Sequence, residues 1–93
     1  MFVTFRDRHT EEFWRRGTGK AAPADLRRVA MRKLKVVSDA AALEDLRVPP
    51  GNHLEELKGD RAGQYSIRIN RRYRVCFFWR EGNAHQVEIV DYH

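Results

Sequence analysis

The sequence predicts an α+β fold in which two N-terminal helices pack on one face of a small, mainly antiparallel β-sheet. Helical periodicity is strongest in the first half of the chain, strand-like alternation fills the second half, and short turns join the strands. The chain has 93 residues, which is enough for one domain and too few for two. Residues 1–93 are therefore expected to form a single domain.

The first elements are a short strand and a short helix. Residues 2–5 (Phe-Val-Thr-Phe) are β-forming and predict a strand. Residues 10–16 predict a helix, which Gly17 is expected to cap at its C-terminus. The glycines in residues 17–21 predict a flexible connection to the next helix.

The longest helix is predicted to start at Pro23, because proline is tolerated in a first turn and Asp25 suits the positive end of the helix dipole. Its apolar residues recur with a helical period, at Leu26, Val29, Ala30, Leu34 and Val37. Another face carries Arg28, Arg32 and Lys35, which form either a solvated surface or a contact with a polyanion or a protein partner. Residues 41–46 predict one more helical turn.

The strands of the second half are separated by turns. Residues 54–57 predict a short strand, and the glycines of residues 58–63 predict a turn. Residues 64–70 alternate, with Tyr65, Ile67 and Ile69 on one face.

The last two strands are predicted to form a hairpin. Residues 73–80 form an almost continuous apolar run that Arg74 interrupts and Arg80 ends. This run predicts a central strand covered on both faces. Residues 81–83 form a tight turn into the closing strand, residues 86–93.

Composition limits the possible partners. There are 18 Lys and Arg against 13 Asp and Glu, which gives a net charge of +5. This charge suits anionic partners and equally a soluble basic protein.

The single cysteine and the four histidines are not expected to form a reactive or metal site. Cys76 lies in an apolar run, which predicts a buried, unreactive thiol. No segment resembles a signal peptide or a transmembrane span, so a cytoplasmic protein without a membrane partner is expected. No cofactor or metal is expected, because no metal-ligand spacing joins the histidines His9, His53, His85 and His93.

Residues suited to acid–base chemistry gather at one edge of the predicted sheet. Pairing across the 81–83 turn brings Asp91, Tyr92 and His93 near residues 70–74. RNA cleavage without a metal needs a base for the 2′-hydroxyl proton, an acid for the leaving 5′-oxygen and cations for the phosphate charge. The edge carries these residue types, although a structural role is the commoner explanation of such a grouping.

Three stretches together form a specific pattern: residues 50–70, the strand Tyr73-Arg-Val-Cys-Phe77, and the final Glu88-Ile-Val-Asp-Tyr-His93. They resemble the HigB toxins, which belong to the RelE-like superfamily of toxin–antitoxin systems. The resemblance implies a RelE-like fold of the microbial ribonuclease type and a bacterial toxin that cuts mRNA in the ribosomal A site without a metal. It also implies a HigA-type helix-turn-helix antitoxin, which neutralises the toxin and through which the pair would reach operator DNA.

The resemblance also implies roles for particular residues. The scissile phosphate would be held by Lys58, Arg68 and Arg74. Acid, base and orienting groups would come from Glu55, Asp91, Tyr92 and His93, with His93 as the general acid. Some HigB toxins have a histidine at the position of Glu55, and other RelE-like toxins have a glutamate base there. The base is thus open between Glu55, Asp91 and His53.

Two other functions fit the same sequence. One is a non-enzymatic RNA- or ribosome-binding module, which would bind with a steep salt dependence and leave RNA intact. The other is a small protein whose helical face holds a regulatory partner. Growth arrest on expression, rescued by the neighbouring gene, would favour the toxin.

Overall fold

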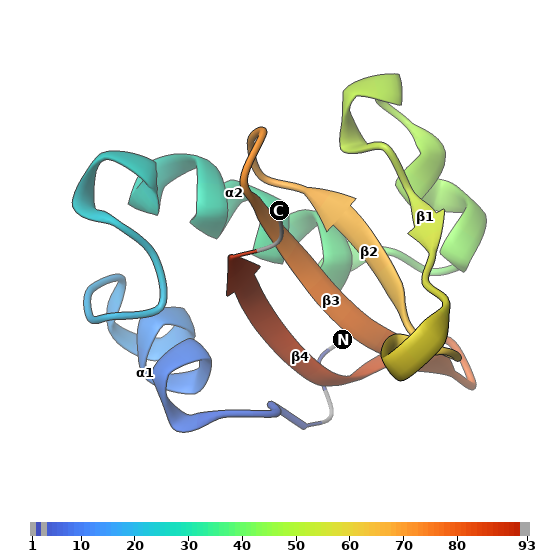
Figure 1. Ribbon diagram of the computed structural model, residues 1–93, viewed down its shortest axis with the longest axis horizontal. Helices are drawn as coiled ribbons and strands as arrows, with labels where there is room; N and C mark the ends of the chain where they lie inside the picture. Colours follow the sequence, from blue (N-terminus) through green and yellow to red (C-terminus); the bar gives the residue numbers. More distant parts are fainter. Residues whose placement is uncertain (1, 3, 92–93) are drawn as a thin grey trace.

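The computed structural model describes residues 2 and 4–91, which form two layers (Figure 1). The helices α1 (Arg8–Arg16) and α2 (Arg27–Asp39) pack against a four-stranded antiparallel sheet of order β1-β2-β3-β4. The strands are β1 (Glu55–Glu56), β2 (Tyr65–Arg68), β3 (Tyr73–Arg80) and β4 (Asn83–Asp91). This arrangement confirms the predicted α+β fold.

Helix α1 ends where the sequence predicts. Gly17 adopts a left-handed conformation with φ of 76°, and its N–H donates to the carbonyl of Phe13 at 2.7 Å. Phe13 itself is fully buried and anchors α1 in the core. The helix begins two residues before the predicted start at Thr10, because Arg8 and His9 extend its first turn.

Helix α2 carries the predicted core stripe, and its deepest residues are Ala30, Leu34 and Val37. It begins at Arg27 and not at Pro23, because residues 24–26 wind as a 3₁₀ turn that leads into the helix. No helix in the described part of the chain is long and apolar enough to cross a membrane.

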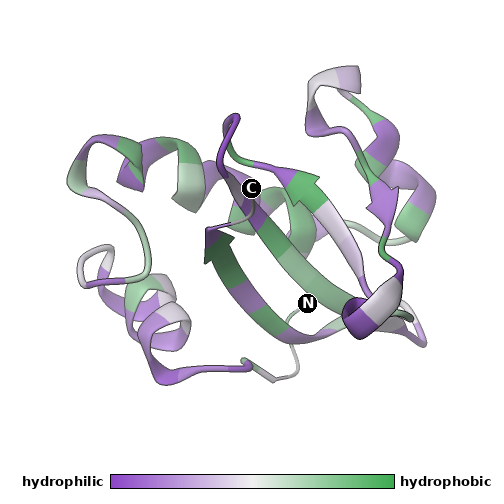
Figure 2. Cartoon of the chain, in the orientation of Figure 1, coloured by the Kyte–Doolittle hydropathy of each residue, from purple (hydrophilic) through white to green (hydrophobic). Residues whose placement is uncertain are grey.

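The sheet buries the face that packs against the helices. Ile67, Val75 and Val87 on this face are fully buried in the core. Hydrophobic residues run along β3 and β4, whereas the β2–β3 connection and the outer side of α1 are hydrophilic (Figure 2). β3 occupies the predicted residues and is central, and residues 74–77 are buried as expected for a strand covered on both faces.

Several elements are shorter or shifted relative to the prediction. In place of a full N-terminal strand, Phe2 and Phe5 make isolated parallel bridges to Ala84 and Val87 of β4. The helical turn predicted at 41–46 is a 3₁₀ turn over Leu43–Arg47.

The strands at the two ends of the sheet also differ in extent. β1 has two residues, although four were predicted. The closing strand begins at Asn83, three residues before the predicted start, and continues through an irregularity near Gln86, whose φ is 50°. Tyr92 and His93 lie outside the described residues.

Candidate functional site

Arg74 is the centre of the candidate site, because it is a charged residue that is only 8% exposed within β3. Its Nε donates to the Ser66 hydroxyl at 2.8 Å, and its Nη2 donates to the His53 carbonyl at 2.9 Å. The Glu55 carboxylate lies 3.4 Å from the same Nη2. A buried charge is tolerated when it is paired and hydrogen-bonded. The sequence-based expectation that Arg74 has partners is therefore confirmed.

A small cleft of about 170 Å³ opens beside Arg74. It is lined by His53, Leu54, Glu55, Arg68 and Arg74. Arg68 lies directly opposite Arg74 in the β2–β3 register, and like charges so placed repel each other. One half-exposed carboxylate, Glu55, accompanies these two guanidinium groups. The cleft is therefore suited to an anion, and arginine offers a planar fork that matches phosphate.

The pleat of the sheet explains why these side chains meet. Side chains alternate between the two faces of a strand, so Arg68 and Arg74 point away from the helices while Ile67 and Val75 point into the core. Glu55 joins the same face because β1 pairs it with Ser66. Three predicted site residues, Glu55, Arg68 and Arg74, are thus brought together in one cleft.

Asp91 lies at the predicted edge but on a different face. β4 pairs it with Tyr73, which confirms the expected approach of the closing strand to residues 70–74. Val90 is the residue opposite Arg74, so the alternation assigns Asp91 to the helical face of the sheet. Its carboxylate forms a two-pronged ion pair with Arg72, whose Nε and Nη2 lie 2.8 Å from its two oxygens. The hydrogen bonds to Asp91 and the negative charge of that carboxylate raise the pKa of Arg72.

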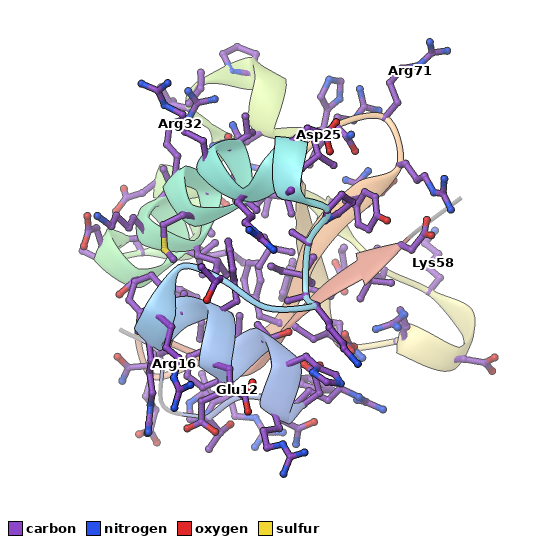
Figure 3. The ribbon with its side chains drawn as sticks, turned by 90° about the vertical axis from the view of Figure 1, so that its left-hand side faces the viewer. Glu12, Arg16, Asp25, Arg32, Lys58 and Arg71 are labelled. Atoms are coloured by element: carbon purple, nitrogen blue, oxygen red, sulfur yellow. The ribbon has the colours of Figure 1, made fainter. Side chains whose placement is uncertain are left out.

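Lys58 is exposed and does not line the cleft. It precedes the 3₁₀ turn Gly59–Arg61 that follows β1. In the side view, Lys58 and Arg32 extend on opposite sides of the molecule, and Arg71 projects from the β2–β3 connection (Figure 3). Tyr92 and His93, the other predicted catalytic residues, are outside the described residues.

Sequence reasoning missed two partners of Arg74. Ser66 is fully buried, and its position on the polar face of an alternating strand, two residues before Arg68, is a signal that could have identified it. The other partner is the backbone carbonyl of His53. Every residue has a backbone carbonyl, so the sequence contains no signal for this contact. His53 adopts a left-handed conformation with φ of 46° and ψ of 55°.

An ion-pair network lies next to the cleft on the same face of the sheet. Glu88 accepts from Arg61 at 2.7 Å and lies 3.6 Å from Arg6. Its cross-strand neighbour, Cys76, is a buried free thiol, as predicted. Burial is the main cause that raises the pKa of Cys76 to about 11, so the thiol stays protonated near neutral pH.

A second hollow of about 450 Å³ lies on the helical layer and is named here the α2 groove. Its lining residues are Gly17, Arg27, Arg28, Met31, Arg32 and Lys35. The predicted contact residues Arg28, Arg32 and Lys35 are exposed, and each contributes to this groove. Among residues 2 and 4–91, no group of three His, Cys, Asp or Glu side chains is arranged to hold a metal.

Comparison with known proteins gives a consistent set of similarities. A model of the family described as the RelE-like toxin HigB of type II toxin–antitoxin systems matches residues 3–93. Toxin HigB-1 of Vibrio cholerae serotype O1 is 38% identical over 85 residues, covering 90% of each chain. Endoribonuclease HigB of Proteus vulgaris is 29% identical over 94 residues, covering 100% of each chain.

Solved structures share the fold at lower identity. A YoeB–YefM complex from Staphylococcus aureus matches with a TM-score of 0.61 and 16% identity, covering 100% of this chain and 98% of that chain. A YoeB/ParE toxin from Agrobacterium tumefaciens matches with a TM-score of 0.50 and 21% identity, covering 96% of each chain.

Proposed function

Because this chain belongs to the HigB-like family, the RelE-like toxins of type II toxin–antitoxin systems, we propose that it is an endoribonuclease that cuts mRNA on the translating ribosome. The observation that carries the proposal is the cleft in which Arg68 and Arg74 face Glu55. Two guanidinium groups beside one carboxylate supply cations for a phosphate and an acceptor for a proton. A relative, the Proteus vulgaris protein, carries the name endoribonuclease.

The proposed reaction is an internal phosphoryl transfer that needs no metal. Glu55 takes the proton from the 2′-hydroxyl, and the 2′-oxygen attacks phosphorus while Arg68 and Arg74 balance the growing negative charge. The bond from phosphorus to the 5′-oxygen breaks, and that oxygen takes a proton from the general acid, for which we propose His93. The products are a 2′,3′-cyclic phosphate and a 5′-hydroxyl end.

The geometry favours Glu55 as the general base over Asp91. Asp91 is paired with Arg72 and belongs to the other face of the sheet. His53 lines the cleft and is the second candidate. We propose that Lys58 adds a cation to the bound RNA and that Asp91 and Tyr92 orient the terminal part of the site.

The test is cleavage of mRNA on translating ribosomes by the purified protein. Arg74→Ala and His93→Gln are expected to abolish cleavage while circular dichroism shows an unchanged fold. Mapping mRNA 5′ ends after brief induction would locate the cuts, and their end chemistry should show a 5′-hydroxyl. Cleavage that survives in both variants would overturn the assigned site.

The partner that we propose is a HigA-type helix-turn-helix antitoxin, with operator DNA reached only through the complex. The solved structures that share the fold include a toxin bound to its antitoxin, YoeB with YefM. Expression of this chain alone in bacterial cytoplasm should arrest growth, and co-expression of the neighbouring gene should restore it. Absence of arrest would favour a non-enzymatic role.

A second candidate function, binding without cleavage, is favoured by the α2 groove. Arg28, Arg32 and Lys35 make no ion pair with any acid in the described residues, and Met31 gives the groove an apolar component. We propose that this surface contacts the ribosome or a protein partner. A binding module would associate with ribosomes in a strongly salt-dependent way and release no cleaved RNA.

A further inference from the structure

We propose that Asn52 is a positioning residue for Arg74 and acts through the backbone carbonyl of His53. The proposal deepens the proposed function, because its effect on cleavage presupposes that Arg74 holds the scissile phosphate. Asn52 does not line the cleft. Its influence on the reaction would therefore pass through its neighbour.

The side-chain amide of Asn52 is fully buried and forms three hydrogen bonds. Its Nδ2 donates to the carbonyls of Leu46 and Val48, each at 3.2 Å. Its Oδ1 accepts from Lys33 Nζ at 2.6 Å. These bonds attach the loop before β1 to α2 on one side and to the preceding 3₁₀ turn on the other. Buried side chains with every bond satisfied hold a backbone in one conformation.

The residue held in this way is His53. Its φ of 46° and ψ of 55° lie in the left-handed region, which residues with a Cβ rarely adopt. Its N–H donates to the carbonyl of Pro50 at 3.0 Å. A left-handed residue persists when the surrounding structure determines it, and the immobilised Asn52 next to it supplies that constraint.

The carbonyl of His53 accepts from Arg74 Nη2 at 2.9 Å, while Ser66 accepts from Arg74 Nε at 2.8 Å. These two acceptors bind different nitrogens of one planar guanidinium group and so restrain its plane. Phosphate recognition by arginine depends on that plane because the fork of N–H groups must face the oxygens. Release of the His53 carbonyl would remove one of these two restraints and allow the guanidinium group to turn.

The first experiment compares Asn52→Ala with Val37→Ala as a control. Val37 is also fully buried, lies on α2, does not line the cleft and takes part in none of the Asn52 hydrogen bonds, so its truncation loosens the packing of the same helix. Asn52→Ala is expected to lower kcat by about ten- to a hundredfold with a smaller change in KM, since small misplacements of a catalytic group have such effects. Val37→Ala should keep wild-type kcat at temperatures where both variants are folded. Equal kcat losses in the two variants would contradict the proposal.

The second experiment tests whether Asn52 acts through Arg74. In an Arg74→Lys background the guanidinium is absent, so Asn52→Ala should cause little further loss of cleavage. A purely structural role would give independent effects that multiply. Multiplying effects would therefore overturn the proposal.

The third experiment observes Arg74 directly and does not depend on cleavage. In ¹⁵N-labelled protein, Asn52→Ala should shift or broaden the Arg74 Nε–H resonance, and Val37→Ala should leave it in place. An unchanged resonance in Asn52→Ala would contradict the positioning role. If the wild-type protein cleaves no RNA, the proposed function fails, and this resonance alone decides whether Asn52 positions Arg74.

Discussion

At the scale of single residues, the site depends on one buried cation that would be costly without its partners. Arg74 interrupts an apolar strand and is held by Ser66, His53 and Glu55. Leaving a buried charge unsatisfied costs several kcal/mol, on the order of 3–5, when one partner of a buried pair is removed. The side chain of Glu55 is 56% exposed, so it can exchange its contact with Arg74 for contact with RNA.

Glu55→Gln should separate proton transfer from binding. The amide cannot take the 2′-hydroxyl proton, so kcat should fall by about 10²- to 10⁴-fold. Removal of the negative charge beside Arg68 and Arg74 should leave RNA affinity unchanged or tighter. Single-turnover cleavage and RNA binding, measured on the same preparation, give the two quantities. A variant with normal kcat would exclude Glu55 as the base and leave His53 as the candidate in the cleft.

Cys76 provides a pH-dependent prediction for stability. Burial raises the pKa of its thiol to about 11 in the folded protein, whereas an unfolded thiol ionises near pH 8.5. The folded state therefore binds more protons between these values, and stability falls as pH rises through that window. From pH 7 to 10.5, the wild type should lose about 2–3 kcal/mol more free energy of unfolding than Cys76→Ala. Urea unfolding at several pH values checks this, and parallel losses in both proteins would contradict it.

At the scale of elements, the structure shows what periodicity and turn chemistry can predict. The cap at Gly17, the core stripe of α2 and the full extent of β3 all followed from residue patterns. Such patterns predict structure because each one depends on residues that are close together in the sequence. The face on which Asp91 lies depends instead on the register of β4 against β3, and the opening turns of α2 depend on where the 3₁₀ turn gives way to helix.

Gly17→Ala should destabilise the protein through the end of α1. A Cβ at φ of 76° is strained even though no atom lies within 4 Å of its position. The expected loss is about 1 kcal/mol in free energy of unfolding. Gly51→Ala is the matched control, because that glycine has equal space and no positive φ. Thermal unfolding of both variants tests this prediction. Equal melting temperatures would show that the cap contributes little to the stability of the protein.

At the scale of the whole molecule, the sequence predicted the layers and much of the cleft. Glu55, Arg68 and Arg74 were named from the sequence and meet in space, because sheet pairing and alternation determine which side chains share a face. The carbonyl of His53 and the bonds of Asn52 could not be predicted, since they depend on a loop conformation that no periodic pattern encodes. The side chain of Lys58 follows β1 at a turn and remains outside the cleft.

The distribution of charge over the two layers leads to the last prediction. The cleft lies on the sheet, and the α2 groove lies on the helices, so cations on the two surfaces should contribute to different steps. Replacing Arg28, Arg32 and Lys35 with alanine should weaken association with ribosomes and reduce the slope of log affinity against log salt, by up to about 0.7–0.9 for each phosphate that the variant no longer neutralises. Because the cleft remains intact, the rate of the chemical step at saturating ribosome concentration should stay at the wild-type value.

The measurements for this triple variant are ribosome co-sedimentation over a salt series and single-turnover cleavage at saturation. Arg15→Ala with Arg47→Ala is a suitable control, because both of these exposed arginines lie outside the groove and pair with acids on their own elements. Their removal lowers the net charge without changing the groove, so the salt slope should follow the wild type. A triple variant with unchanged ribosome affinity that loses antitoxin binding would instead assign the groove to the protein partner. Unchanged binding to both would exclude the α2 groove as a contact surface.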